Sequence, residues 1–79
     1  MSSLNQELKA LIANLFECDI NELTDDIGPG EVEGWDSLGH VSLMAEILDQ
    51  MNVHIAVEDA IEVESIADIE RLIGEAQEA

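Results

Sequence analysis

The sequence predicts an all-α fold, a small four-helix bundle of three longer helices and one short helix, with a long loop between the first two helices. Apolar residues make up 47% of the chain and aromatic residues only 3%, so the core must be aliphatic, which favours helix-on-helix packing. Three stretches repeat apolar residues at steps of three and four, as amphipathic helices do. Because 79 residues suffice for one small core, we expect residues 1–79 to form a single domain.

The first helix is expected to begin at a cap on Ser2 or Ser3 and to end near Glu17. Its apolar stripe consists of Leu4, Leu8, Leu11, Ile12, Leu15 and Phe16. From Cys18 to Asp36 the periodicity stops, and the only proline and three of the five glycines fall here. A connection this long is usually functional or held by apolar anchors. The candidate anchors are Ile20, Leu23, Ile27, Val32 and Trp35.

The second helix is expected to begin at Asp36 or Ser37 and to end near Met51. At about 100° per residue, one stripe faces the core, and it consists of His40, Leu43, Met44, Ile47 and Met51. A second apolar band lies beside it and consists of Leu38, Val41, Ala45 and Leu48. A surface helix needs only one buried stripe, so this band is either covered by the long loop or open to a partner.

Two further helices are expected after Asn52. The first is a short turn around Glu58 to Glu62. Ser65 and Asp68 then resemble a capping box, which marks the start of the last helix. The apolar face of that helix consists of Ile66, Ile69, Leu72, Ile73 and Ala76.

The charge of the chain excludes several classes of partner. Nineteen acidic residues against two basic ones give a formal net charge of -17, which excludes nucleic acids and anionic membrane surfaces. Attraction to basic surfaces of other proteins remains. The self-repulsion should destabilise the compact state, so salt should raise the melting temperature. We find no export signal and no apolar run of about 20 residues, and we therefore expect a cytoplasmic protein without membrane insertion.

The residues that bind metals lack the usual spacings. Cys18 is the only cysteine, which excludes an internal disulfide, and with two scattered histidines it offers no zinc motif. In the acidic segment that begins at Asp19, Leu23 and Thr24 stand where a calcium loop needs an oxygen ligand and a glycine. We therefore expect a solvated acidic loop and no metal site.

Ser37 lies where the acidic loop meets the second helix, and three roles are open to it. As a hydrolase nucleophile it would need glycine two residues earlier, where Trp35 stands, so that motif fails. His40 belongs to the core stripe and is expected to be structural, and His54 is expected to be a loop residue. As an attachment point, Ser37 would place a phosphate at a helix N-terminus, which favours negative groups. As a simple cap, Asp36 or Ser37 would serve equally well.

The segment "DSLGHVSLMAEI", residues 36–47, resembles the Asp-Ser-Leu motif and the following helix of the acyl carrier protein family. Size, acidity, the long first loop, Ile55 before a short helix and the capped last helix agree with this family over nearly the whole chain. The resemblance implies that Ser37 carries a 4′-phosphopantetheine arm. A separate magnesium-dependent phosphopantetheinyl transferase would recognise Asp36 and transfer the arm from coenzyme A to Ser37. It also implies a carrier that holds acyl groups as thioesters, is not an enzyme itself, and is expected to be a monomer.

The resemblance implies a docking surface for acyl-loading and acyl-transferring enzymes with basic surfaces. Leu38 and Val41 match its apolar contact positions, and the full expected surface adds Ala45, Leu48, Glu46, Asp49, Glu58, Asp59 and Glu62. The inner positions, where the family can shelter an acyl chain, match Leu43, Met44, Ile47 and Met51.

Several residues differ from the common family pattern. Gly39 and His40 replace an acid and a small hydroxyl residue, Leu48 replaces an acid, and Ala56 stands where proline is frequent. These differences favour a carrier for a specialised fatty acid, polyketide or related pathway. An aminoacyl or peptidyl carrier with the same arm remains an alternative, although such domains often have other residues where Gly34 and Trp35 stand here. From a different class, an acidic interaction module or a nucleic-acid-mimicking decoy also remains open.

Overall fold

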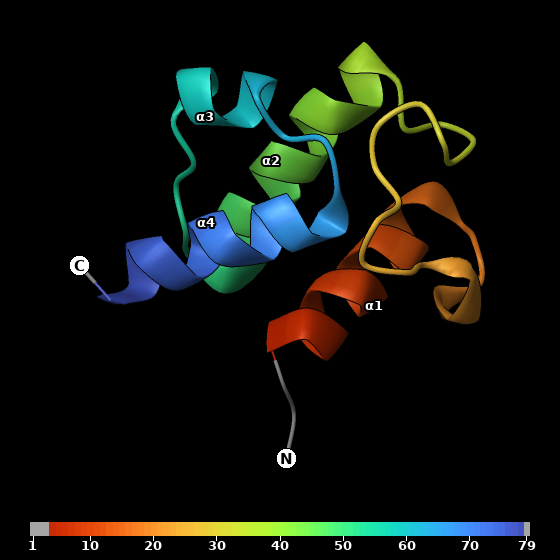
Figure 1. Ribbon diagram of the computed structural model, residues 1–79, viewed down its shortest axis with the longest axis horizontal. Helices are drawn as coiled ribbons and strands as arrows, with labels where there is room; N and C mark the ends of the chain where they lie inside the picture. Colours follow the sequence, from red (N-terminus) through yellow and green to blue (C-terminus); the bar gives the residue numbers. More distant parts are fainter. Residues whose placement is uncertain (1–3, 79) are drawn as a thin grey trace.

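The chain folds into four α-helices and one 3-10 turn within residues 4–78, which are the residues that the computed structural model describes (Figure 1). The elements are α1 (Leu4–Phe16), η1 (Ile20–Glu22), α2 (Ser37–Met51), α3 (Val57–Ile61) and α4 (Ile66–Glu78). No strand occurs in this range, and the predicted small helical bundle is confirmed. The proposed caps at Ser2 and Ser3 lie outside the described residues.

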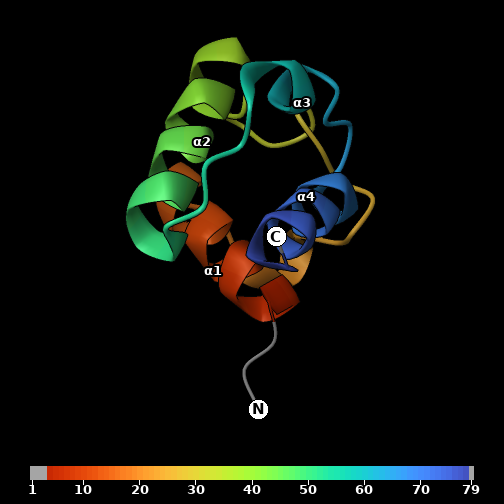
Figure 2. The same ribbon diagram turned by 90° about the vertical axis from the view of Figure 1, so that its left-hand side faces the viewer.

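The core is aliphatic apart from one tryptophan. Helix α1 packs against α2 and α4, and α3 lies beside the N-terminal half of α2, as both views show (Figure 1, Figure 2). The fully buried side chains are Leu8, Ile12, Trp35, Leu43, Ile47, Ile66, Ile69 and Ile73. The stripes expected from helical periodicity therefore supply the core. None of the helices described is both long and apolar enough to span a bilayer.

The ends of α2 and α4 are fixed by local hydrogen bonds. At the C-terminus of α2, Asn52 adopts a left-handed conformation (φ 58°) and its N–H donates to the carbonyl of Leu48 at 3.0 Å. At the start of α4, the Ser65 hydroxyl accepts from the N–H of Asp68 at 3.3 Å. The Asp68 carboxylate in turn accepts from the N–H of Glu64 at 2.9 Å, so the capping box forms with its return bond shifted by one residue.

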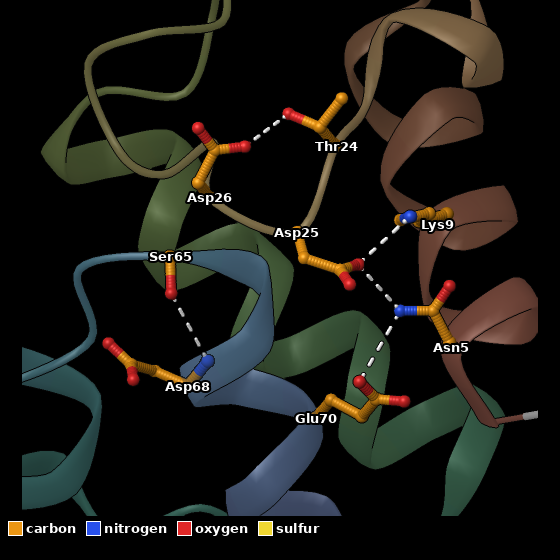
Figure 3. Close-up of polar contacts among 8 residues, drawn as sticks. All are labelled: Asn5, Lys9, Thr24, Asp25, Asp26, Ser65, Asp68 and Glu70. Carbon is orange, nitrogen blue, oxygen red and sulfur yellow. Dashed lines mark hydrogen bonds and ion pairs between the residues drawn. The ribbon is translucent and has the colours of Figure 1, made fainter.

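The long loop between α1 and α2 is tied to the bundle through Asp25 (Figure 3). The Asp25 carboxylate accepts a hydrogen bond from the Asn5 side-chain amide at 2.9 Å and pairs with the Lys9 ammonium at 3.0 Å. The same Asn5 amide donates to the Glu70 carboxylate at 3.3 Å. The amide of Asn5 and the carboxylate of Asp25 thus join the loop to α1 and α4 (Figure 3).

Backbone bonds and apolar anchors hold the same loop. The N–H of Ile66 donates to the carbonyl of Ile27 at 2.8 Å, which fixes the loop against the first turn of α4. Of the expected anchors, Leu23 and Trp35 are buried, and Ile27 and Val32 are partly buried. The prediction that Ile20 is also an anchor was wrong, because Ile20 lies exposed in the 3-10 turn. A turn of three residues leaves no periodicity in the sequence from which it could be predicted.

Candidate functional site

Ser37 is the first residue of α2, and it is exposed. The cap of the helix is Asp36, whose backbone is extended (φ -99°, ψ -164°) and whose carboxylate accepts from the N–H of Gly39 at 2.8 Å. The first helical hydrogen bond runs from the N–H of His40 to the carbonyl of Asp36 at 2.8 Å. Because Asp36 supplies the cap, the hydroxyl of Ser37 is not needed for it.

The backbone around Ser37 favours a negative group. The N–H groups of Ser37 and Leu38 belong to the first turn of α2 and have no carbonyl one turn earlier in the helix to accept them. The positive end of the helix dipole lies at the same place. The carboxylate of Asp36 opposes this attraction in part, although one of its oxygens accepts the N–H of Gly39. An exposed hydroxyl in this position suits esterification by a phosphate.

Trp35 fixes the loop directly before the site. Its ring is fully buried and stacks on Phe16, with centroids 5.6 Å apart and planes 18° apart. The indole N–H donates to Nδ1 of His40 at 3.0 Å, and Nε2 of His40 lies 2.9 Å from the carbonyl oxygen of Ala60 in α3. The expected roles of Trp35 as an anchor and of His40 as a structural residue are confirmed.

Gly39 allows the first turn of α2 to approach the loop closely. A Cβ atom at this position would lie 2.0 Å from the carbonyl oxygen of Gly34. Gly34 itself has φ +92°, a conformation that favours glycine. Sequence reasoning noted Gly39 only as a departure from the family pattern. Its low helix propensity in a first turn was the signal for a packing role.

The second apolar band of α2 is open to solvent. Leu38 is 76% exposed, Val41 65% and Leu48 45%, and Ala45 is exposed as well. Two residues of α3 that sequence reasoning missed extend this band, namely Val57 at 73% and Ile61 at 76% exposed. We call Leu38, Val41, Ala45, Leu48, Val57 and Ile61 the α2–α3 apolar face. Contiguous exposed apolar residues bordered by charge are typical of interaction sites.

The acidic residues of the expected docking surface separate into two groups. Asp49 on α2 and three acids on or directly after α3, Glu58, Asp59 and Glu62, are exposed. Glu46 is half-buried, accepts a hydrogen bond from Gln50 at 3.2 Å and lines a groove together with residues of α1. The structure therefore places Glu46 away from the α2–α3 apolar face.

An apolar groove of about 680 Å³ lies beside Ser37, between α2 and α3. Besides Asp36 and Ser37 its lining consists of Pro29, Gly30, Trp35, His40, Val41, Met44, Ile55, Val57, Ala60, Ile61 and Val63. Of the expected inner positions, Met44 lines this groove, whereas Leu43 and Ile47 are fully buried in the bundle. An exposed hydroxyl next to an apolar groove fits a covalently attached arm that carries an apolar group.

The remaining reactive side chains lie apart from this site. Burial, followed by the charges of Glu22 and Asp19, raises the pKa of the Cys18 thiol, which makes it less reactive. His54 is exposed in the connector between α2 and α3. In the part of the chain that the structure describes, no three histidine, cysteine or acidic residues are grouped as metal ligands.

Residues 6–73 match a family model whose description is the phosphopantetheine attachment site. The match extends from α1 into α4 and includes the long loop, the cap at Asp36, Ser37 and the whole of α3.

Proposed function

Because the chain belongs to the phosphopantetheine attachment site family, we propose that it is a carrier protein that holds acyl intermediates on an arm attached to Ser37. Family membership establishes covalent 4′-phosphopantetheine as the cofactor and a carrier role at this level. Our proposal adds three points to this: the attachment residue, the chemistry of the cargo and the docking surface.

The observation that carries the proposal is that Asp36 caps α2, so that Ser37 does not have to. Asp36 caps α2 through the N–H of Gly39, and this leaves the exposed hydroxyl of Ser37 available for esterification. The neighbouring carboxylate of Asp36 is available for recognition by the phosphopantetheinyl transferase. When bound, the arm supplies a flexible thiol on which the cargo is held as a thioester.

The groove beside Ser37 supports an acyl cargo over an aminoacyl one. Its side-chain nitrogens belong to Trp35 and His40, and both nitrogens of His40 already have partners. The carboxylate of Asp36 and the hydroxyl of Ser37 are the only side-chain oxygens in the lining, and both residues are exposed; an ammonium group placed deeper than these would lose its hydration without gaining a side-chain acceptor, which is unfavourable. A hydrocarbon chain would instead lie against Met44, Ile55 and other apolar side chains. The departures from the common family pattern support a specialised fatty acid, polyketide or related pathway.

The α2–α3 apolar face supports brief docking to enzymes. Three of its residues, Val41, Val57 and Ile61, line the groove next to Ser37, and the exposed acidic residues Asp49, Glu58, Asp59 and Glu62 lie beside it along the chain. Charge at the border speeds association with a basic enzyme surface, and a small apolar centre gives a modest lifetime. Family membership supports this role over that of an interaction module or a decoy. In the proposed role the carrier itself performs no catalytic turnover.

Intact-mass measurement tests the attachment. The folded protein is incubated with coenzyme A and a broad-specificity phosphopantetheinyl transferase, and one phosphopantetheinyl group should be added. Ser37→Ala should stay unmodified, while the matched control Ser42→Ala should be modified like the wild type, because Ser42 is also exposed on α2. Modification of Ser37→Ala, or no modification of the folded wild type, would contradict the proposal.

Nuclear magnetic resonance tests the cargo. The protein is loaded once with a saturated acyl group and once with an amino acid on the same arm. The acyl load should shift the methyl signals of Met44 and Ile55, which line the groove, and the aminoacyl load should leave them near their unloaded positions. Equal shifts with both loads would remove the argument for an acyl cargo.

A further inference from the structure

A hydrogen-bonded bridge joins α2 to α3 at the inner side of the groove beside Ser37, and we propose that this bridge keeps the cargo out of the core. The bridge runs from the indole of Trp35 through the ring of His40 to the carbonyl of Ala60. An acyl chain on the arm then lies in the groove, between the bridge and solvent. This inference rests on the proposed function, because it concerns where an acyl cargo on Ser37 lies.

The groove and the core meet at this bridge. Three of the residues that line the groove are buried, namely Trp35, Ala60 and Val63. The first two are the ends of the bridge, and His40, which connects them, lines the groove as well. The bridge is therefore part of the wall between the groove and the interior of the bundle.

Helix α2 turns one side to the groove and another side to the core. Val41 and Met44 line the groove, whereas Leu43 and Ile47 are fully buried and do not line it. At about 100° per residue, His40 lies between these two pairs around the helix axis. The ring of His40 thus stands at the boundary that a chain would have to cross to reach the core.

Both ends of the His40 ring are held. The indole N–H of Trp35 is a donor only, so Nδ1 of His40, 3.0 Å away, accepts. The hydrogen of the neutral ring is therefore on Nε2, which donates to the carbonyl oxygen of Ala60 at 2.9 Å. The ring spans the space from the buried indole to α3 and cannot turn aside without breaking a hydrogen bond.

A hydrocarbon chain that entered the core here would have to separate the bridge. It offers no acceptor to the indole N–H of Trp35, and a buried donor without a partner is costly. Trp35 itself is held in place, since its ring stacks on Phe16 with centroids 5.6 Å apart and its carbonyl accepts the N–H of Gly30 at 2.7 Å. Along the groove the chain contacts Met44 and Ile55 and breaks no hydrogen bond.

The groove gives the cargo only shallow shelter. Val41, Val57 and Ile61 belong to its lining and are largely exposed. Each methylene that leaves water stabilises the bound chain about four-fold, so a chain in the core would be held more tightly than one in this groove. His40 therefore determines how deeply the cargo is bound and keeps it within reach of a docked enzyme.

Nuclear Overhauser contacts of the cargo test the bridge in the full-length protein, loaded from octanoyl coenzyme A. Intact mass first shows whether the octanoyl-phosphopantetheinyl group is attached; its absence would refute the proposed function and this inference with it. In the loaded wild type, the terminal methyl of the cargo should contact Met44 and Ile55 but neither Leu43 nor Ile47. Contacts with Leu43 or Ile47, or with none of the four, would overturn the inference and leave the attachment untouched.

Substitution of the ring tests its role directly. In His40→Ser the contacts should extend to Leu43 and Ile47, and hydroxylamine should cleave the octanoyl thioester at least about four-fold more slowly than in the wild type, as expected if one further methylene leaves water. An acetyl thioester, too short to reach the core, should be cleaved at equal rates in both proteins. The matched control His54→Ser, at an exposed position, should behave like the wild type with either cargo.

A second variant is available if His40→Ser does not fold. His40→Asn keeps an acceptor near the indole of Trp35 but is too short to reach Ala60, so it should admit the octanoyl chain in the same way. Unchanged contacts and an unchanged cleavage rate in a folded variant, or the same slowing in His54→Ser, would overturn the inference. If neither variant folds, the contacts in the wild type decide.

Discussion

Truncation of two leucines on different faces of α2 tests the separation of its buried stripe from its docking band. Leu38 is 76% exposed and belongs to the α2–α3 apolar face, whereas Leu43 is fully buried in the core. Each is changed to alanine, so the two variants lose the same atoms from the same helix. We expect Leu38→Ala to impair recognition with little effect on stability, and Leu43→Ala to do the reverse.

The sizes of both effects follow from the exposure of each side chain. Full burial of a leucine side chain stabilises by about 1.5–3 kcal/mol, and since 76% of Leu38 is exposed, docking has about 1–2 kcal/mol to gain from covering it. Leu38→Ala should therefore lower kcat/KM for phosphopantetheinyl transfer roughly 5- to 30-fold. Truncation of the buried Leu43 should cost about 2–5 kcal/mol, which corresponds to a decrease in melting temperature of about 10–40 °C.

Transferase kinetics and thermal melting measure the two variants side by side. Leu38→Ala should melt within about 4 °C of the wild type, as exposed substitutions usually do. The kinetics of Leu43→Ala are compared well below its melting temperature and should be close to those of the wild type. If Leu38→Ala is modified at the wild-type rate, the α2–α3 apolar face does not contact the transferase; if Leu43→Ala melts like the wild type, the packing of α2 is wrong.

Three further perturbations probe the loop and the charge. Gly39→Ala should lower the melting temperature and slow modification, because the added Cβ would lie 2.0 Å from a carbonyl oxygen of the preceding loop. The control Gly74→Ala, which has open space around it, should stabilise α4 by about 0.5–1 kcal/mol. Equal effects of the two substitutions on the melting temperature would refute the close approach of Gly39 to the loop. Two neighbours lower the pKa of Asp25: the hydrogen bond from Asn5 has the larger effect and Lys9 the smaller. The stabilising contribution of the Asp25 carboxylate is therefore complete above the ordinary aspartate pKa and is lost as the pH falls through the lower pKa of the folded state. Denaturant midpoints between pH 6 and 3 should therefore decline less in Lys9→Met than in the wild type, and parallel declines would count against the ion pair. With a net charge of -17, the melting temperature should rise with sodium chloride, and a flat or falling curve would show that repulsion is unimportant.

The helices and the two faces of α2 were predictable because helical periodicity is a local property of the sequence. The angles between Leu43 and Ile47 place them on one stripe, and those of Leu38 and Val41 place them on the next, as the structure has them. The cap of α2 was not decided by the sequence, since aspartate and serine serve equally well there. The extended backbone of Asp36 decides it.

The contacts that define the site come from residues far apart in the chain, and local patterns do not predict them. The bond between His40 and Ala60 joins residues 20 positions apart, and the approach of Gly39 to Gly34 depends on the path of the loop. The exposure of Val57 and Ile61 was also missed. A helix of five residues is too short for its periodicity to show which side faces the core.

The most direct measurement of the central claim is the position of the arm in the protein isolated from its native cell. Fragmentation mass spectrometry of the intact chain, with the thioester preserved, locates the modified residue and gives the mass of its cargo in the same experiment. We predict one phosphopantetheinyl group on Ser37 that carries an acyl group without a free amine. A group on another residue, or a folded native protein without any such group, would contradict it.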